Sequence, residues 1–219
     1  PVLEAGGATI GVVESVQGIS WQELTISGQS NHAGTTPIAM RRDPGLVAAR
    51  IMAFARDLAD RFGQPQVATV GSVEFLPNLV NVVPSLAAIT VDLRNTDEAI
   101  LQKAEAEFAT FVAEAAEAEG CTVETRSLAR FEPVRFDADV IGLVEATAAS
   151  LGLSSRRMPS GAGHDAQMFA RVCPTAMIFT PSQNGLSHNP AEYTSPSDLE
   201  AGANVLLQVM MSLSSEESR

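Results

Sequence analysis

The chain has 219 residues, enough for one large domain or two small ones. Its formal net charge is −12, from 14 basic and 26 acidic residues, and no basic patch is dense enough to neutralise phosphates. The charge therefore argues against nucleic acid or an anionic membrane as a partner. No apolar run approaches the roughly 18 residues of a membrane helix, so we expect a cytoplasmic protein.

The two cysteines, Cys121 and Cys173, lack the CxxC spacing of a zinc or redox motif. We expect neither a disulfide framework nor a structural zinc site. Each cysteine is predicted to be a small buried apolar residue.

The first half of the chain alternates between strand and helix patterns. The β-rich composition of 19–27 predicts a strand. Asp43 followed by Pro44 predicts a helix start, and apolar residues then recur at helical spacing until Gly63. Residues 67–75 predict a second strand. The following segment LPNLVNVVPS is punctuated by Pro and Asn, which indicates a loop or an irregular edge.

Residues 86–94 predict a strand with apolar side chains on one face and Arg94 on the other. Thr96 is predicted to cap a helix that ends at Gly120, and a fourth strand is expected at about 121–129. The order β-α-β-β-α-β is typical of a ferredoxin-like domain, in which both helices cover one face of an antiparallel sheet. The other face is left open.

From about residue 132 the pattern changes to α/β. We expect a helix at 138–151, a Gly-rich loop SGAGHDAQ, a short helix, a buried strand at 176–179 and a final helix. A capping box at 197–200 predicts where that helix begins, and the last residues, SSEESR, have the composition of a frayed end. This segment resembles the tail of a domain whose first part precedes it, and the first dozen residues are assigned to the same domain.

All three histidines lie in loops rich in Gly, Ser, Asn and Pro, which makes a joint chemical role attractive. His188 follows a buried strand, where an imidazole suits a metal ligand or a base; the alternative is a polar loop histidine. His164 follows glycines that let a carboxylate or oxyanion approach backbone N–H groups; the alternative is a turn with Asp165 as a helix N-cap.

Residue patterns alone do not specify a reaction. Asn81 is interpreted as a turn residue and Arg94 as a surface charge at a strand end. No HExxH or GxSxG motif occurs. The patterns therefore indicate a two-part α/β protein with a histidine-bearing site.

Three segments, GQSNHAGTTPIAMRRDP, SGAGHDAQMFA and SHNPAEYTSPSD, together resemble a family of zinc-dependent amidohydrolases. It includes N-carbamoyl-L-amino acid hydrolases, allantoate amidohydrolases and β-ureidopropionases of the aminoacylase–carboxypeptidase clan. The resemblance implies a ferredoxin-like dimerisation domain at 14–131, inserted in a partial α/β zinc-hydrolase catalytic domain at 1–13 and 132–219. The N-terminal half of that catalytic domain is expected upstream of Pro1.

The resemblance also implies roles for single residues. His32 is the family histidine that reaches the active site of the other subunit and donates a hydrogen bond to the oxyanion of the tetrahedral intermediate. His188 is a metal ligand. Four further residues are implied in substrate binding, namely Asn81, Arg94, Gly163 and His164.

The implied enzyme is a homodimeric hydrolase of C–N bonds other than peptide bonds, acting on N-carbamoyl amino acids or a related ureido compound such as allantoate. It would use two divalent metal ions, Zn or alternatively Mn, Co or Ni. We expect the 219-residue chain alone to hold no metal tightly and to be inactive. The alternatives are an aminoacylase or dipeptidase of the same clan, and a non-catalytic dimerisation module.

Overall fold

The computed structural model describes residues 1–216 and divides into two compact units. We call Gln17–Pro133 the inner unit, because it is the internal segment of the sequence. The outer unit combines Pro1–Val16 with the chain from Val134 onward. Both contain strands and helices, so the predicted mixed α/β class is confirmed. No helix of the described residues is long and apolar enough to cross a membrane.

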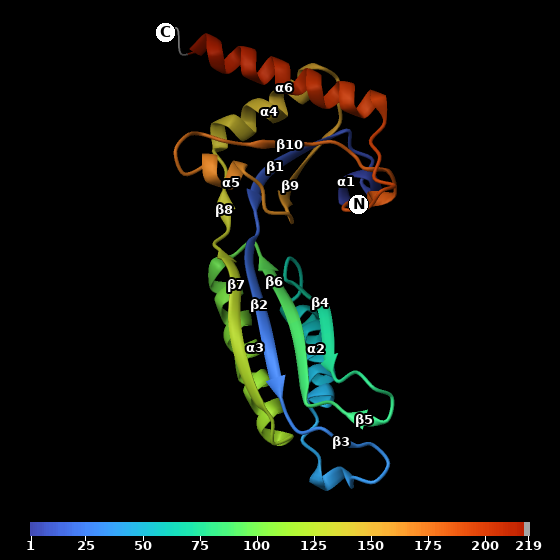
Figure 1. Cartoon of the computed structure of the whole chain (residues 1–219). Coiled ribbons are helices and arrows are strands. Elements are labelled where there is room, and N and C mark those ends of the chain that lie inside the picture. The colour runs from blue at the N-terminus through green and yellow to red at the C-terminus, as the bar shows by residue number, and fades with distance from the viewer. Residues whose placement is uncertain (217–219) are drawn as a thin grey trace. The chain divides into compact units, whose positions relative to one another are not determined.

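A four-stranded antiparallel sheet with two helices on one face forms the inner unit (Figure 1). The strand order is β4-β6-β2-β7, and the chain order is β-α-β-β-α-β as the sequence predicts. The elements are β2 (Gly18–Ser27), α2 (Pro44–Phe62), β4 (Val67–Leu76), β6 (Leu86–Asn95), α3 (Glu98–Ala118) and β7 (Thr122–Phe131).

The core of the inner unit lies between the helices and one face of this sheet. In β6 the apolar Ile89, Val91 and Leu93 are buried, whereas the alternating positions, including Asp92 and Arg94, remain partly exposed on the other face. Burial of each such apolar side chain contributes about 1.5–3 kcal/mol to stability. The apolar residues that recur at helical spacing in α2 and α3 form the opposite side of this core. They are Val47, Ile51, Ala55, Leu58, Leu101, Ala104, Phe108, Val112 and Ala115.

An aspartate caps the N-terminus of each helix of the inner unit, α2 and α3. The Oδ1 atom of Asp43 accepts hydrogen bonds from the amides of Gly45 and Leu46, as predicted. The prediction of Thr96 as the cap of α3 is wrong, because Asp97 is the N-cap and accepts from the Ile100 amide at 3.0 Å. The side chain of Asn95 accepts from the Asp97 amide at 2.9 Å, which supports a helix start one residue later.

A small two-stranded sheet, which we call the tip, extends the inner unit. It pairs β3 (Asn31–His32) with β5 (Val82–Val83), and the 3-10 helix η1 (Ile38–Met40) follows β3. Figure 1 shows the tip beyond the end of the sheet at which β2 ends and β6 begins. The sequence indicated only loops or an irregular edge at these strands.

The outer unit is built around β1 (Ile10–Val16). This strand pairs antiparallel with β8 (Val134–Arg135) and β10 (Met177–Phe179), and parallel with β9 (Ser155–Ser160). The helices α4 (Ala138–Ser150) and α6 (Pro196–Glu216) pack with it around a second core. The sequence analysis missed β1 and β9. The short elements are α1 (Val2–Ala5), α5 (Ala166–Phe169) and η2 (Gln183–Gly185).

Two local predictions in this part of the sequence need correction. The cap of α6 is Ser195, whose Oγ accepts from the Asp198 amide at 3.1 Å, and Pro196 occupies the first helical position. The helix continues to Glu216, so the predicted frayed end is wrong for 214–216, while 217–219 lie outside the described residues.

The cysteines differ in exposure. Both are free thiols, in agreement with the predicted lack of a disulfide. Cys121 is buried as predicted, and burial together with the nearby charges of Glu119 and Asp43 raises the pKa of its thiol. The prediction is wrong for Cys173, which is exposed just beyond the short α5 helix.

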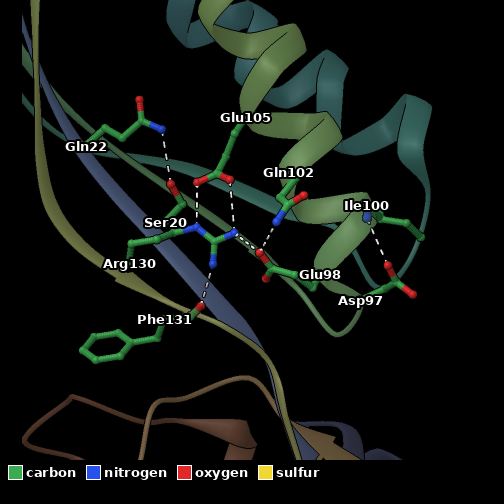
Figure 2. A network of polar contacts seen from close by, with 9 residues as sticks. All are labelled: Ser20, Gln22, Asp97, Glu98, Ile100, Gln102, Glu105, Arg130 and Phe131. Atoms are coloured by element: carbon green, nitrogen blue, oxygen red, sulfur yellow. Dashed lines mark hydrogen bonds and ion pairs between the residues drawn. The ribbon is translucent and has the colours of Figure 1, made fainter.

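Arg130 ties the end of β7 to the first turns of α3 (Figure 2). Its guanidinium donates to Glu105 at 2.9 and 3.2 Å, to Glu98 at 2.6 Å and to the Phe131 carbonyl at 2.9 Å. Partial burial alone would lower the pKa of Arg130, but the hydrogen bonds to both glutamates outweigh it and raise that pKa. One cation therefore compensates two carboxylates.

Arg130→Met should lower the free energy of unfolding of the inner unit by about 2–3 kcal/mol, because two neighbouring carboxylates lose their charged partner. Urea unfolding followed by the fluorescence of Trp21, the single tryptophan, measures this. Arg126→Met is the matched control, since its pair with Glu23 is exposed and is worth about 0–1 kcal/mol. Equal losses in the two variants would contradict the assigned role of Arg130.

Candidate functional site

His32 stands exposed on the tip, with one ring nitrogen enclosed by its own loop. Its Nδ1 atom accepts hydrogen bonds from the amides of Gly34 at 3.0 Å and Thr35 at 3.2 Å. In a neutral imidazole one nitrogen is a donor and the other an acceptor, so the proton resides on Nε2. His32 therefore presents an N–H donor.

Asn81 lies beside His32 because β3 and β5 pair. The Asn81 carbonyl accepts from the Ala33 amide at 2.9 Å, and His32 is opposite Val82 in the register. The structure thus brings together two of the predicted site residues. Exposed apolar side chains also occur in this part of the inner unit, at Ile38, Met40, Leu76, Leu79 and Val80.

Arg94 is held by two residues that the sequence analysis did not single out. Its Nε lies 3.0 Å from both carboxylate oxygens of Asp92, and its Nη2 lies 2.7 Å from Oδ2. The guanidinium also lies 5.8 Å from the centre of the Trp21 ring. The Asp-x-Arg spacing could have indicated the Asp92–Arg94 pair from the sequence, because residues two apart in a strand share one face.

Arg94 and the tip lie at opposite ends of the sheet within the inner unit. Arg94 pairs with Ile19 near the start of β2, whereas the tip follows the end of β2, where Ser27 pairs with Leu86. Arg94 lies eight positions after Leu86 in β6, a distance of about 26 Å at 3.3 Å per residue. One small ligand cannot contact both Arg94 and His32 of the same inner unit.

In the outer unit, hydrogen bonds of two side chains, His164 and Gln167, join the Gly-rich loop to the start of α5. The His164 amide donates to Gln167 Oε1 at 3.1 Å, and His164 Nδ1 accepts from the Ala166 amide at 3.2 Å. Asp165 occupies the N-cap position but makes no side-chain capping bond. Gly163 and His164 are exposed, and His164 also lines a cavity of about 570 Å³ whose other walls are mostly apolar side chains of α4, β10 and α6.

His188 lies in an exposed turn with a φ of 56°. Its amide donates to Glu192 Oε2 at 3.0 Å. Within residues 1–216, no three His, Cys, Asp or Glu side chains gather in a way that could hold a metal ion. A catalytic zinc ion takes three protein ligands, so His188 could be one ligand, but these residues do not form a complete centre.

A profile of the peptidase family M20/M25/M40 matches residues 1–212, and the chain belongs to this family. It is 40% identical to an allantoate amidohydrolase of Escherichia coli K12 over 212 residues, which are 97% of this chain and 52% of the relative. It is 39% identical to an N-carbamoyl-L-amino-acid amidohydrolase of Rhizobium meliloti, covering 96% of this chain and 51% of the relative. The resemblance seen in the sequence is confirmed.

Solved structures of amidases also match this chain. An amidase of the hydantoinase/carbamoylase family from Burkholderia multivorans matches with a TM-score of 0.92 and 40% identity, over 97% of this chain and 52% of that one. One from Burkholderia vietnamiensis matches with a TM-score of 0.91 and 42% identity, over 97% and 51%. The chain therefore spans about half the length of the relatives it matches.

Gln167→Met should loosen the Gly-rich loop without unfolding the outer unit, because it removes the acceptor for the His164 amide and keeps the side-chain volume. One lost hydrogen bond of about 1 kcal/mol predicts roughly fivefold faster hydrogen exchange at that amide. Nuclear magnetic resonance can measure this exchange residue by residue. The exposed Gln183→Met is the control, and unchanged exchange in Gln167→Met would show that another group holds the loop.

Proposed function

We propose that this chain is part of an amidohydrolase that cleaves the C–N bond of N-carbamoyl amino acids or of a related ureido compound such as allantoate. The relatives named for these reactions, at 39–40% identity, support this substrate class. The bonds cleaved are not peptide bonds. We propose the cytoplasm as its location, consistent with the acidic composition.

The observation that carries the proposal is the fixed N–H donor of His32. Hydrolysis of a carbamoyl or ureido carbon passes through a tetrahedral intermediate with a negatively charged oxygen. A preorganised donor that meets this oxygen stabilises the transition state by about 3–4 kcal/mol. His32 Nε2 suits this task, because the amides of Gly34 and Thr35 already occupy its other nitrogen.

Four other residues are proposed to bind the substrate. Arg94 would bind a carboxylate, which guanidinium recognises through paired hydrogen bonds, while Asp92 and Trp21 keep its plane in place. Asn81 would contact the substrate beside His32. Gly163 and His164 would contact it from the exposed Gly-rich loop.

The separation of about 26 Å supports a shared active site, in which Arg94 comes from one copy of the protein and His32 from another. We therefore propose a homodimer formed through the inner unit, acting as a ferredoxin-like dimerisation domain. The exposed apolar side chains near His32, such as Val80 and Met40, are suited to burial against a second copy.

Two divalent metal ions are the proposed cofactors, zinc or alternatively manganese, cobalt or nickel. When bound, such ions supply an activated water and polarise the carbon that is attacked. His188 is the one ligand that we assign in this chain. Because residues 1–216 gather no complete ligand set, the other ligands would come from polypeptide outside this chain. On this proposal the 219-residue chain alone is inactive.

A family that is named for peptidases supports a second candidate, hydrolysis of N-acyl amino acids or dipeptides. A substrate panel separates the two. Release of ammonia from N-carbamoyl amino acids or allantoate supports the first candidate, whereas turnover of acyl or peptide substrates alone supports the second. No turnover by the complete enzyme with metal would favour a non-catalytic dimerisation module.

His32→Ala in the complete enzyme should lower kcat by about 10²–10³-fold with a smaller effect on KM, because the lost donor acts mainly in the transition state. Steady-state kinetics on an N-carbamoyl amino acid measure both constants. Thr35→Ala, which keeps the backbone amide of the loop, is the control. An unchanged kcat in His32→Ala would leave His32 without a catalytic role.

Mixing two inactive variants tests the shared site. When His32→Ala and Arg94→Ala subunits are combined in equal amounts, half of the dimers are mixed, and each mixed dimer has one site with both residues intact. About a quarter of the wild-type activity should therefore return. Activity that stays at the level of the separate variants would place both residues of each site in one subunit.

A further inference from the structure

Arg41 holds the loop whose amides cap the Nδ1 atom of His32. Its Nη2 donates to the Ala33 carbonyl at 2.6 Å and its Nε donates to the Thr36 carbonyl at 3.1 Å. The side chain is half-buried, and one end of its planar guanidinium makes both contacts. The loop between these carbonyls is therefore fixed at both ends by one residue.

The two amides that cap His32 lie between these fixed points. Gly34 and Thr35 donate to Nδ1 at 3.0 and 3.2 Å. The backbone also closes on itself, since the Thr36 amide donates to the His32 carbonyl at 3.2 Å. A loop held in this way aims two N–H groups at one ring nitrogen.

Gly34 permits the close approach that this arrangement needs. A Cβ atom at Gly34 would lie 3.3 Å from His32 Cε1 and 3.5 Å from Nδ1. The first distance is tighter than ordinary van der Waals contact, so a side chain there would push the imidazole away from the amides. The sequence brings a glycine, an arginine and a histidine to one loop for one geometric result.

We propose that Arg41 is a positioning residue for His32. By clamping the Ala33 and Thr36 carbonyls, it holds the Gly34 and Thr35 amides on Nδ1 and so keeps the proton of the neutral imidazole on Nε2, directed out of the loop. Arg41 contacts no reacting atom in this scheme. The catalytic meaning of the clamp rests on the proposed function, but its effect on the imidazole does not.

The test uses the 219-residue chain, uniformly labelled with ¹⁵N, at about pH 8, where an ordinary imidazole is neutral. Two-bond nitrogen–proton spectra report which ring nitrogen carries the proton, and His32→Gln identifies the His32 signals. In the wild type, Nδ1 should be an unprotonated acceptor with a single tautomer. In Arg41→Met, the Nδ1 shift should move toward the average of two tautomers, and the Gly34 and Thr35 amides should exchange at least about tenfold faster.

Two further variants separate positioning from general stability. Arg41→Lys keeps the positive charge but has one donor nitrogen in place of the Nε and Nη2 pair, and it should restore part of the wild-type spectrum. Arg42→Met is the matched control, because the Arg42 side chain lies against Gly120 instead of the His32 loop. Its Cγ atom is 3.6 Å from the place where a Cβ atom added to Gly120 would lie. Arg42→Met should leave the His32 spectrum unchanged, and both methionine variants should keep the wild-type unfolding midpoint.

An averaged tautomer in the wild type, or an Arg41→Met spectrum and amide exchange equal to the wild type, would overturn the proposal. A changed spectrum together with a general loss of folding would also overturn it, since the effect would not be local. If His32→Ala leaves kcat of the complete enzyme unchanged, the proposed catalytic role fails while the clamp stands. If the clamp fails and His32→Ala is still impaired, only the role of Arg41 is refuted.

Discussion

Burial of one face of the four-stranded sheet beneath two helices is the constraint on which the inner unit depends. Side chains alternate between the faces of a strand, so a register shift of one residue would place Asp92 and Arg94 in the core and expose Val91 and Leu93. The apolar face thus fixes the polar face as well. The same ten-residue strands also fix how far Arg94 lies from the tip, a length that one small ligand cannot span within one inner unit.

The tip follows a different principle, because a sheet of two residue pairs has little stability of its own. Its shape depends on side chains and on single backbone bonds, including those of Arg41 and the Asn81 carbonyl. A donor in such a place is rigid at the level of its own loop although its surroundings are exposed. This combination is what the role proposed for His32, as a donor to an oxyanion in a second copy, would require.

The sequence predicted best the elements that local signals define. Asp43, Pro44 and Gly63 mark the ends of α2. Apolar residues at every second position predict β6, and the same positions are buried in the structure. The strands β1 and β9 were missed because their pairing joins residues about 145 positions apart, and nothing local reveals it. For the site, the sequence motifs pointed to His32, and the Asp92-x-Arg94 spacing could have indicated one partner of Arg94. The contact of Arg94 with Trp21 and the hydrogen bonds of Arg41 depend on backbone geometry that no residue spacing encodes.

The unequal exposure of the two cysteines has a practical consequence for studying the two units. Cys121 is enclosed in the inner unit, so a thiol-reactive fluorophore would attach to native protein at Cys173 of the outer unit without any mutation. Trp21, the single tryptophan, belongs to the inner unit. The unmodified sequence therefore already carries a donor and a labelling position for energy transfer, which would report the separation of the units in solution.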